Sequence, residues 1–256
     1  MSQDLTQRLY QELSTLEPGN LQSLYKLATD TANPNAKIKG IFATALLQDA
    51  RTQVQGTQDV FAKIYHNAKS LLNIEDPTKH KAFARFMAEY FKFNEQVDKF
   101  NKELNLPDFV KAVTGLQSST RGVTGALSDL MADIGADKQI LNLLLRGTGL
   151  ENISSIDQLT EMLSGRIDLS GNKIIQTLGG SWEDITRSVF TDITPDDLLY
   201  NLSNVLPLNL EVPGTITPEG LAKSIREAVL SQFGLPKDFQ NDALNELLAK
   251  VINTDA

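Results

Sequence analysis

The sequence predicts an all-α protein, and three observations support this fold class. Apolar residues recur at steps of three and four along most of the first half, which is the period of a helix. The second half contains short segments that begin with Ser or Thr followed by acidic residues, a pattern typical of helix N-termini. Strand-like alternation is convincing only in residues 206–216, and one such segment cannot form a sheet alone. We therefore expect at most one extended segment.

The composition is that of an ordinary globular protein, with 41% hydrophobic and 22% charged residues. A length of 256 residues is enough for one large domain or two small ones. The chain contains no cysteine, which excludes disulfides, thiolate metal sites, iron–sulfur clusters and cysteine nucleophiles.

Charge is distributed unevenly along the chain. Residues 1–128 contain 15 Lys or Arg and 13 Asp or Glu, whereas residues 129–256 contain 9 and 19. This asymmetry suggests two regions with different surroundings. We predict an N-terminal helical domain over residues 1–113, a joint over residues 114–125 and an acidic C-terminal helical region over residues 126–256.

The first half contains a series of helical patterns. Apolar spacing predicts helices over residues 5–16, 21–28, 36–54 and 57–72. The strongest pattern follows Asp76, a plausible N-cap, and Pro77, which suits the first helical position.

This long helix carries a row of mostly aromatic residues at alternating steps of three and four. The row consists of Phe83, Phe86, Tyr90, Phe93, Val97, Phe100 and Leu104. Such a row predicts the spine of the N-terminal core. The alternative is a helix that binds a partner in a larger assembly, and in that case Phe86, Tyr90, Phe93 and Phe100 are the candidate partner-binding residues.

The stretch TGLQSSTRGVTG, residues 114–125, is rich in glycine and hydroxyl side chains, and we interpret it as a flexible joint. A P-loop would need a Gly-Lys pair, and the chain has none. A weaker hypothesis is an anion site formed by Arg121, Gly122 and Gly125, because a helix that starts after Gly125 would point free N–H groups at the ligand.

The second half predicts short capped helices and one amphipathic helix near its end. Caps are expected at Ser154 or Ser155, at Ser181, at Thr194 and at Thr217, and the last helix is expected over residues 237–252. The extended segment and the last helix are elements that often pack on a neighbouring subunit. Their candidate partner-binding residues are Leu208, Leu210, Val212, Leu244 and Leu248.

Residues for catalysis are scarce. The two histidines, His66 and His80, lack the spacing of a helical metal site, so we predict no metal and no cofactor. The carboxylate pairs at 183–184 and 196–197 follow a Ser or Thr cap, where acidic side chains stabilise the helix dipole. A carboxylate-based enzyme or secreted effector, with a site in a cleft between the two halves, remains the alternative class.

Other partners are less favoured by the sequence. The acidic second half disfavours nucleic acid. The longest apolar stretches, such as residues 140–145, are far shorter than the roughly 20 residues of a membrane span. The N-terminus lacks a basic segment followed by an apolar run, so we expect cytoplasmic synthesis without a signal peptide and a soluble product. A membrane-active protein that exposes its aromatic helix is a third possibility, but the polar face of that helix carries both charge signs.

These observations favour a non-catalytic structural or protein–protein interaction subunit of a larger assembly. We expect it to bind protein subunits, either copies of itself or other chains, and to be an oligomer or part of a complex. Richness in Gln, Asn, Thr and Ser without cysteine resembles the composition of tailed-phage virion subunits and their assembly factors. This resemblance is compositional, and no motif carries it.

Overall fold

The structure, a computed structural model, describes residues 5–73, 80–102, 106–135, 137–198, 227, 230, 235–236 and 238–252. These residues form α-helices and short 3-10 helices, and no strand occurs among them. The predicted all-α fold is confirmed. The predicted extended segment at 206–216 and the predicted caps at Asp76 and Thr217 lie outside the described residues.

The chain folds into two compact units that differ from the predicted domains. Unit 1 combines Met1–Asp49 with Asn172–Ala256, and unit 2 is the continuous segment Ala50–Gly171. The predicted boundary at 114–125 falls inside unit 2, so the change in composition along the chain does not coincide with a change of unit.

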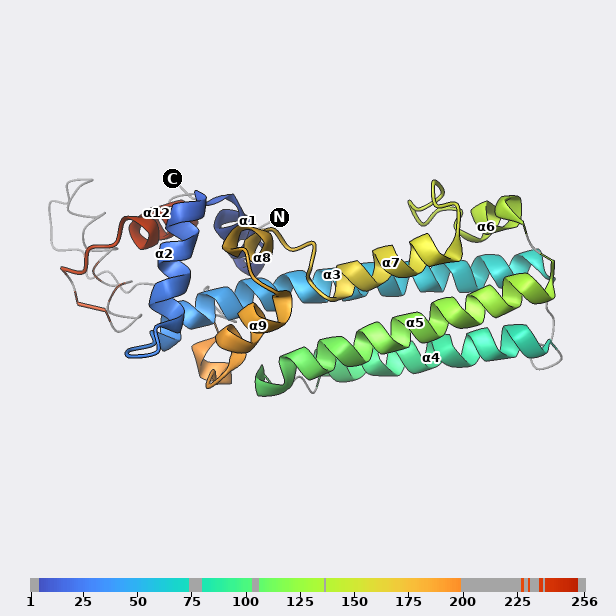
Figure 1. Cartoon of the computed structure of the whole chain (residues 1–256), viewed down its shortest axis with the longest axis horizontal. Coiled ribbons are helices and arrows are strands. Elements are labelled where there is room, and N and C mark those ends of the chain that lie inside the picture. Colours follow the sequence, from blue (N-terminus) through green and yellow to red (C-terminus); the bar gives the residue numbers. More distant parts are fainter. Residues whose placement is uncertain are drawn as a thin grey trace, which may run out of the picture. The chain divides into compact units, whose positions relative to one another are not determined.

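Unit 1 is built around the first part of a long helix. α1 (Leu5–Thr15) and α2 (Pro18–Thr29) precede α3 (Ala36–Leu71), whose start is capped by the side chain of Asn35. Residues 38–47 of α3 are all buried, as expected of a helix that is covered on every side. In Figure 1, α1, α2, α8 and α9 lie around this part of α3.

α3 is one continuous helix where the sequence predicts two. The predicted break near Gln55 and Gly56 does not occur. Glycine within a helix costs only about 1 kcal/mol relative to alanine. The neighbouring Val54 and Thr57 are buried, and this packing holds the helix together across the glycine.

Three further α-helices of unit 1 lie within the residues that the structure describes. α8 (Lys173–Leu178) and α9 (Trp182–Phe190) pack against α2, and α12 (Asp242–Ile252) packs against α1 and α2. The predicted Ser181 cap is confirmed, because its hydroxyl accepts from the Asp184 N–H at 3.1 Å. The predicted start at Thr194 yields only a short 3-10 helix in the described chain, η3 (Pro195–Asp197).

Unit 2 is a bundle formed by the second part of α3 and the helices that follow it. α4 (Lys81–Lys102) and α5 (Phe109–Asp133) lie side by side, and α7 (Ile156–Ile167) packs against α5 (Figure 1). The 3-10 helix η2 (Leu106–Asp108) directly precedes α5, and α6 (Lys138–Leu144) comes after α5. The predicted cap at Ser155 is confirmed at the start of α7.

The predicted joint at residues 114–125 is wrong, since the whole stretch lies within α5. Its small residues allow α4 to approach closely. A Cβ at Gly122 would lie 2.6 Å from a carboxylate oxygen of Glu89 on α4. The hydroxyls of Thr120 and Thr124 are buried but donate to backbone carbonyls one turn earlier, at 2.9 and 3.2 Å. The composition that resembles a loop is therefore that of a tightly packed helix.

Candidate interaction surface

Most of the aromatic row on α4 is buried within unit 2. Phe86 and Phe93 are fully buried, and Phe100 is nearly so. The Phe93 ring meets Phe61 of α3 edge-on, with centroids 5.1 Å apart. The predicted core role is confirmed for the five buried members of the row, whereas Tyr90 is partly exposed and Leu104 lies outside the described residues. Phe86, Phe93 and Phe100, three of the candidate partner-binding residues, are therefore not on an open surface.

A smaller aromatic group reaches the surface where α3 and α4 meet. Phe91 of α4 is 49% exposed, and its ring lies 5.6 Å from Tyr90 and 6.2 Å from Tyr65 of α3. The rings of Tyr65 and Tyr90 are stacked, with centroids 5.3 Å apart, and both residues are partly exposed. We call Tyr65, Tyr90 and Phe91 the aromatic surface.

Only Tyr90 of this surface was a candidate from the sequence. Phe91 is one residue away from the buried row, which turns its side chain by about 100° around the helix axis. That offset was a usable signal, because a residue beside a core row lies at the edge of the buried face. Tyr65 could not be found in this way, since its role depends on the packing of α3 against α4.

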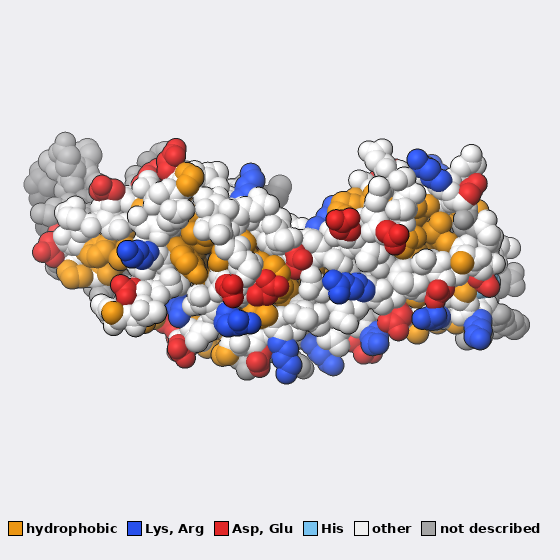
Figure 2. All heavy atoms as spheres, in the orientation of Figure 1, with side chains coloured by type: hydrophobic (Ala, Val, Ile, Leu, Met, Phe, Trp, Pro, Cys, Tyr) orange, Lys and Arg blue, Asp and Glu red, His pale blue; other side chains and the backbone are white. Residues whose placement is uncertain are grey.

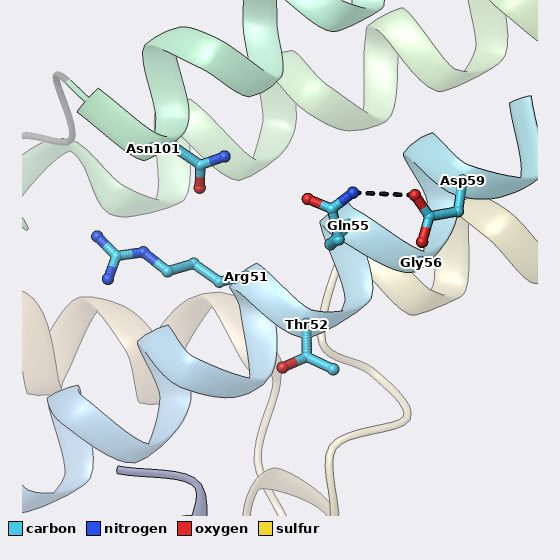
Figure 3. Close-up of a pocket in the computed structure, with 6 residues that line it drawn as sticks. All are labelled: Arg51, Thr52, Gln55, Gly56, Asp59 and Asn101. Carbon is cyan, nitrogen blue, oxygen red and sulfur yellow. Dashed lines mark hydrogen bonds between the residues drawn. The ribbon is translucent and has the colours of Figure 1, made fainter. Parts of the chain in front are cut away.

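A shallow polar pocket lies between the same two helices (Figure 3). Its volume is about 520 Å³ and it is open to solvent. Gln55 donates to Asp59 at 3.0 Å within it. The lining residues are Arg51, Thr52, Gln55, Gly56, Asp59 and Asn101. These side chains can form hydrogen bonds with a polar ligand.

Among the described residues of unit 2, two other large apolar side chains are exposed. Leu71 at the end of α3 is 41% exposed, and Leu143 of α6 is 47% exposed. On the face shown in Figure 2, hydrophobic side chains are visible around α6 and α7. Over α4 and α5 on that face, basic and acidic side chains are interspersed and do not form a patch of one sign.

The predicted anion site lacks the geometry that it requires. Arg121, Gly122 and Gly125 lie in the middle of α5, which begins at Phe109. Within a helix the backbone N–H groups bond to carbonyls one turn earlier and are not free to bind an anion. α5 continues without a break from Gly125 to Asp133, so the helix start that this hypothesis requires is absent.

The candidate residues near the C-terminus give a mixed result. Leu244 is fully buried in unit 1, where α12 packs on α1 and α2. The side chain of Leu248 lies outside the described residues, as do Leu208, Leu210 and Val212. Their role as partner-binding residues stays a prediction.

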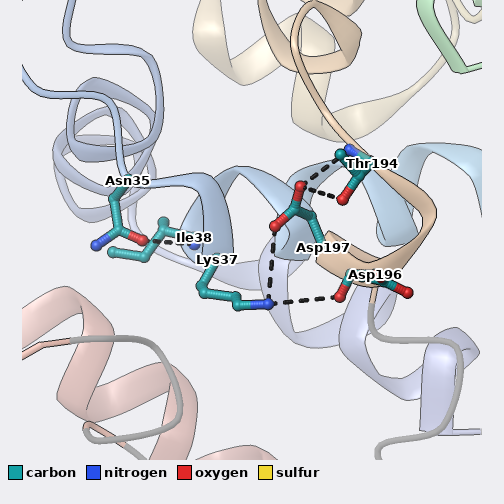
Figure 4. Close-up of polar contacts among 6 residues, drawn as sticks. All are labelled: Asn35, Lys37, Ile38, Thr194, Asp196 and Asp197. Atoms are coloured by element: carbon teal, nitrogen blue, oxygen red, sulfur yellow. Dashed lines mark hydrogen bonds and ion pairs between the residues drawn. The ribbon is translucent and has the colours of Figure 1, made fainter.

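The carboxylate pair at Asp196 and Asp197 has a structural role in unit 1 (Figure 4). The Asp197 carboxylate accepts from the N–H and the hydroxyl of Thr194, at 2.9 and 2.7 Å, and lies 3.7 Å from the Lys37 ammonium. Burial raises the pKa of Asp197, but the Thr194 hydrogen bonds and the Lys37 charge outweigh burial and lower it overall. Asp196 contributes its backbone carbonyl to Lys37.

The backbones of α3 and η3 also come close together, which reinforces the contact between Lys37 and Asp197. A Cβ at Gly40 of α3 would lie 1.8 Å from the Asp197 carbonyl oxygen, so only glycine fits at this position. The other acidic pair, Glu183 and Asp184, lies in the first turn of α9, where the helix dipole stabilises negative charge. Both pairs therefore have structural explanations that need no substrate.

A buried polar network links three helices of unit 1. Asn172 caps α8 and donates to the buried Asp49 carboxylate at 2.7 Å. Burial and the Asp49 charge raise the pKa of Tyr10 to about 12, and its hydroxyl bonds to Asp49. This network joins α1, α3 and α8.

In the glycine-rich loop after α6, the Glu151 carboxylate accepts hydrogen bonds from the loop backbone. The N–H groups of Glu151 itself and of Gly147 and Gly149 hold the pKa of Glu151 below its ordinary value. The Gly147 N–H donates to this carboxylate at 2.7 Å, and Lys63 of α3 donates to the Gly147 carbonyl. The Glu151 side chain thus accepts hydrogen bonds from backbone N–H groups of its own loop.

No metal site is evident in the described part of the chain, where no group of three or more His, Asp or Glu converges. In the same residues, no helix combines the length and the hydropathy that crossing a bilayer requires.

Comparison with known proteins gives no relative. No protein-family model, no curated protein and no solved structure matches this chain.

Proposed function

We propose that this protein is a non-catalytic structural or protein–protein interaction subunit of a larger assembly, and that the aromatic surface is where it binds a protein partner. The observation that carries the proposal is the 49% exposure of Phe91 beside Tyr65 and Tyr90. Exposed aromatic side chains in a group are enriched at protein interfaces, where they bury large areas at little entropic cost.

The setting of the three rings suits such a role. Tyr65 and Tyr90 are held by stacking against each other, and Tyr65 also stacks on the buried Phe83 at 5.7 Å. Rings fixed in this way lose little conformational freedom when a partner binds. A rigid helix pair also positions a binding surface more reliably than a loop does.

The kind of assembly is suggested by composition. A cysteine-free chain rich in Gln, Asn, Thr and Ser fits a tailed-phage virion subunit or an assembly factor of such a particle. Within this proposal, the partner is another subunit of the particle or a second copy of the chain.

Photo-crosslinking tests the proposal directly. A photoreactive phenylalanine analogue replaces Phe91 in the cells that make the protein, and a matched variant carries it at Ser118, an exposed position of α5. We expect one discrete protein adduct from position 91 that is absent from position 118. The absence of an adduct at 91, or the same adducts from both positions, would contradict an interaction at the aromatic surface.

A further inference from the structure

The outer side of α4 carries an apolar stripe separate from the buried row. It consists of Ala84, Met87, Ala88 and Phe91, which lie on one side of the helix because they are three and four positions apart. Ala88 and Phe91 are exposed, and Ala84 and Met87 are partly exposed. The side of α4 that faces α5 is different, since Arg85 there pairs with Asp129 of α5.

We propose that this stripe binds the same stripe of a second copy of the chain, with the two α4 helices antiparallel. The inference rests on the proposed function, because it names the partner of the surface that includes Phe91. It is a specific version of that function, and a different partner at Phe91 would leave the more general proposal intact.

The order of large and small side chains supports this arrangement. When two α4 helices run antiparallel with the two-fold axis between Met87 and Ala88, Phe91 of each copy lies opposite Ala84 of the other. The two Ala88 side chains then meet near the axis. Each large ring faces a small residue, which lets the backbones approach and the rings pack. A parallel arrangement would instead place Phe91 against Phe91 and leave the alanines facing each other.

Charges at the two ends of the stripe also favour antiparallel pairing. Lys81 and Glu95 are both exposed, and neither makes an ion pair within the described chain, whereas Lys92 lies near Glu89 of its own helix. In the antiparallel arrangement Lys81 of one copy lies beside Glu95 of the other, and this occurs twice by symmetry. A parallel arrangement would place like charges together.

The expected dimer is weak. Two helices that pair over four turns bury less accessible surface than the roughly 1,200 Å² at the lower end of stable interfaces. We therefore expect a dissociation constant in the micromolar range or above, which sedimentation at rising concentration can measure. The Phe91→Ala variant should raise this constant at least tenfold, because Phe91 is the largest side chain of the stripe and aromatic side chains dominate such interfaces.

The absence of cysteine permits a direct test of the geometry. In an Ala88→Cys variant of the full chain, the two new thiols lie near the two-fold axis and should form a disulfide under mild oxidation. Asp98→Cys is the matched control, because Asp98 is also exposed on α4 and takes no part in the proposed ion pairs, and its two copies would be about 31 Å apart along the axis. Equal cross-linking at both positions would overturn the antiparallel arrangement.

Charge reversal gives a second test, and it leaves the buried residues of the protein unchanged. Lys81→Glu and Glu95→Lys should each weaken the dimer several-fold, and the double variant should restore it to within about twofold, since exposed pairs each contribute modestly. Circular dichroism of each variant confirms that the helices are intact. Single reversals without effect, or a double variant as weak as the singles, would overturn the proposal.

The outcome also separates this inference from the proposed function. A chain that stays monomeric at millimolar concentration, but gives an adduct with a different protein at position 91, overturns self-association and supports the interaction role. A monomeric chain that gives no adduct overturns both.

Discussion

Gly40 lies against the backbone of η3 at a distance that leaves no space for a side chain. The Asp197 carbonyl oxygen would be 1.8 Å from a Cβ at this position, and backbone cannot move aside as a flexible side chain can. We expect Gly40→Ala to lower the free energy of unfolding by roughly 2–3 kcal/mol, in the range of overpacking substitutions. Urea denaturation followed by circular dichroism would measure the change.

The same helix provides the control for this prediction. Gly56 also lies within α3, but nothing is within 4 Å of where its Cβ would be. Gly56→Ala should therefore raise the free energy of unfolding by about 0.5–1 kcal/mol, because alanine favours the helix over glycine. If Gly40→Ala were as stable as Gly56→Ala, the close contact between α3 and η3 would not exist in solution.

The Asp197 carboxylate makes stability depend on pH. Its pKa is lowered in the folded state, so its contribution is present above the pKa of the unfolded chain and is lost as pH falls through the folded pKa. Asp197→Asn should destabilise the protein at pH 7, and the difference from the wild type should shrink on acidification.

Asp196→Asn is the matched control, because Asp196 contacts Lys37 through its backbone carbonyl. Unfolding measured at pH 7 and at successively lower pH would distinguish the two variants. A constant difference between Asp197→Asn and the wild type at every pH would show that charge is not the cause.

At the scale of elements, α5 shows what the sequence could and could not predict. Its glycines and hydroxyl residues favour a loop when each is considered alone. In the helix Gly122 lies against Glu89 of α4, and Thr120 and Thr124 are buried, and a local pattern does not reveal these neighbours. Caps are different, because the cap at Ser155 or Ser181 depends on the residues that directly follow it. Local signals therefore gave these helix starts correctly.

The same distinction applies to the aromatic surface. The spacing on α4 identified the buried row correctly, because a repeat of three and four is a property of one helix. Whether Tyr90 or Phe91 reaches solvent depends on where α3 covers α4. This is a property of the two packed helices and not of α4 alone. The sequence could indicate the right helix but not the exposed side chain.

Gly125 tests the helical state of the stretch that was expected to be a joint. It is exposed in α5, and nothing is within 4 Å of where its Cβ would be. Gly125→Ala should raise the free energy of unfolding by about 0.5–1 kcal/mol, since it favours the helix without a new contact. Thermal unfolding would show the gain. A flexible joint would show no change or a loss.

Along the chain, unit 2 is a single segment placed between the two segments of unit 1. Its core is made by its own helices, since the buried rings of Phe61, Phe86, Phe93 and Phe109 all belong to it. Unit 1 requires both ends of the chain, because α1 and α2 pack on α8, α9 and α12. Unit 2 is thus inserted within the sequence of unit 1, and the two units do not simply follow one another along the chain.

Two fragments distinguish this nested organisation from the division that the composition suggests. Residues 50–171 contain all of α4, α5 and α7, and we expect this fragment to unfold cooperatively with a helical circular dichroism spectrum. Residues 1–113 contain α4 without most of α5, which leaves uncovered the buried side chains of α4 that pack on α5, although α3 is still present. That fragment should aggregate or unfold without a sharp transition, because an aromatic face exposed to water is unstable. Cooperative folding of residues 1–113, together with a failure of residues 50–171 to fold, would contradict the nested organisation. The domain boundary would then lie near residue 114, and the packing of α4 on α5 would not be what stabilises this part of the chain.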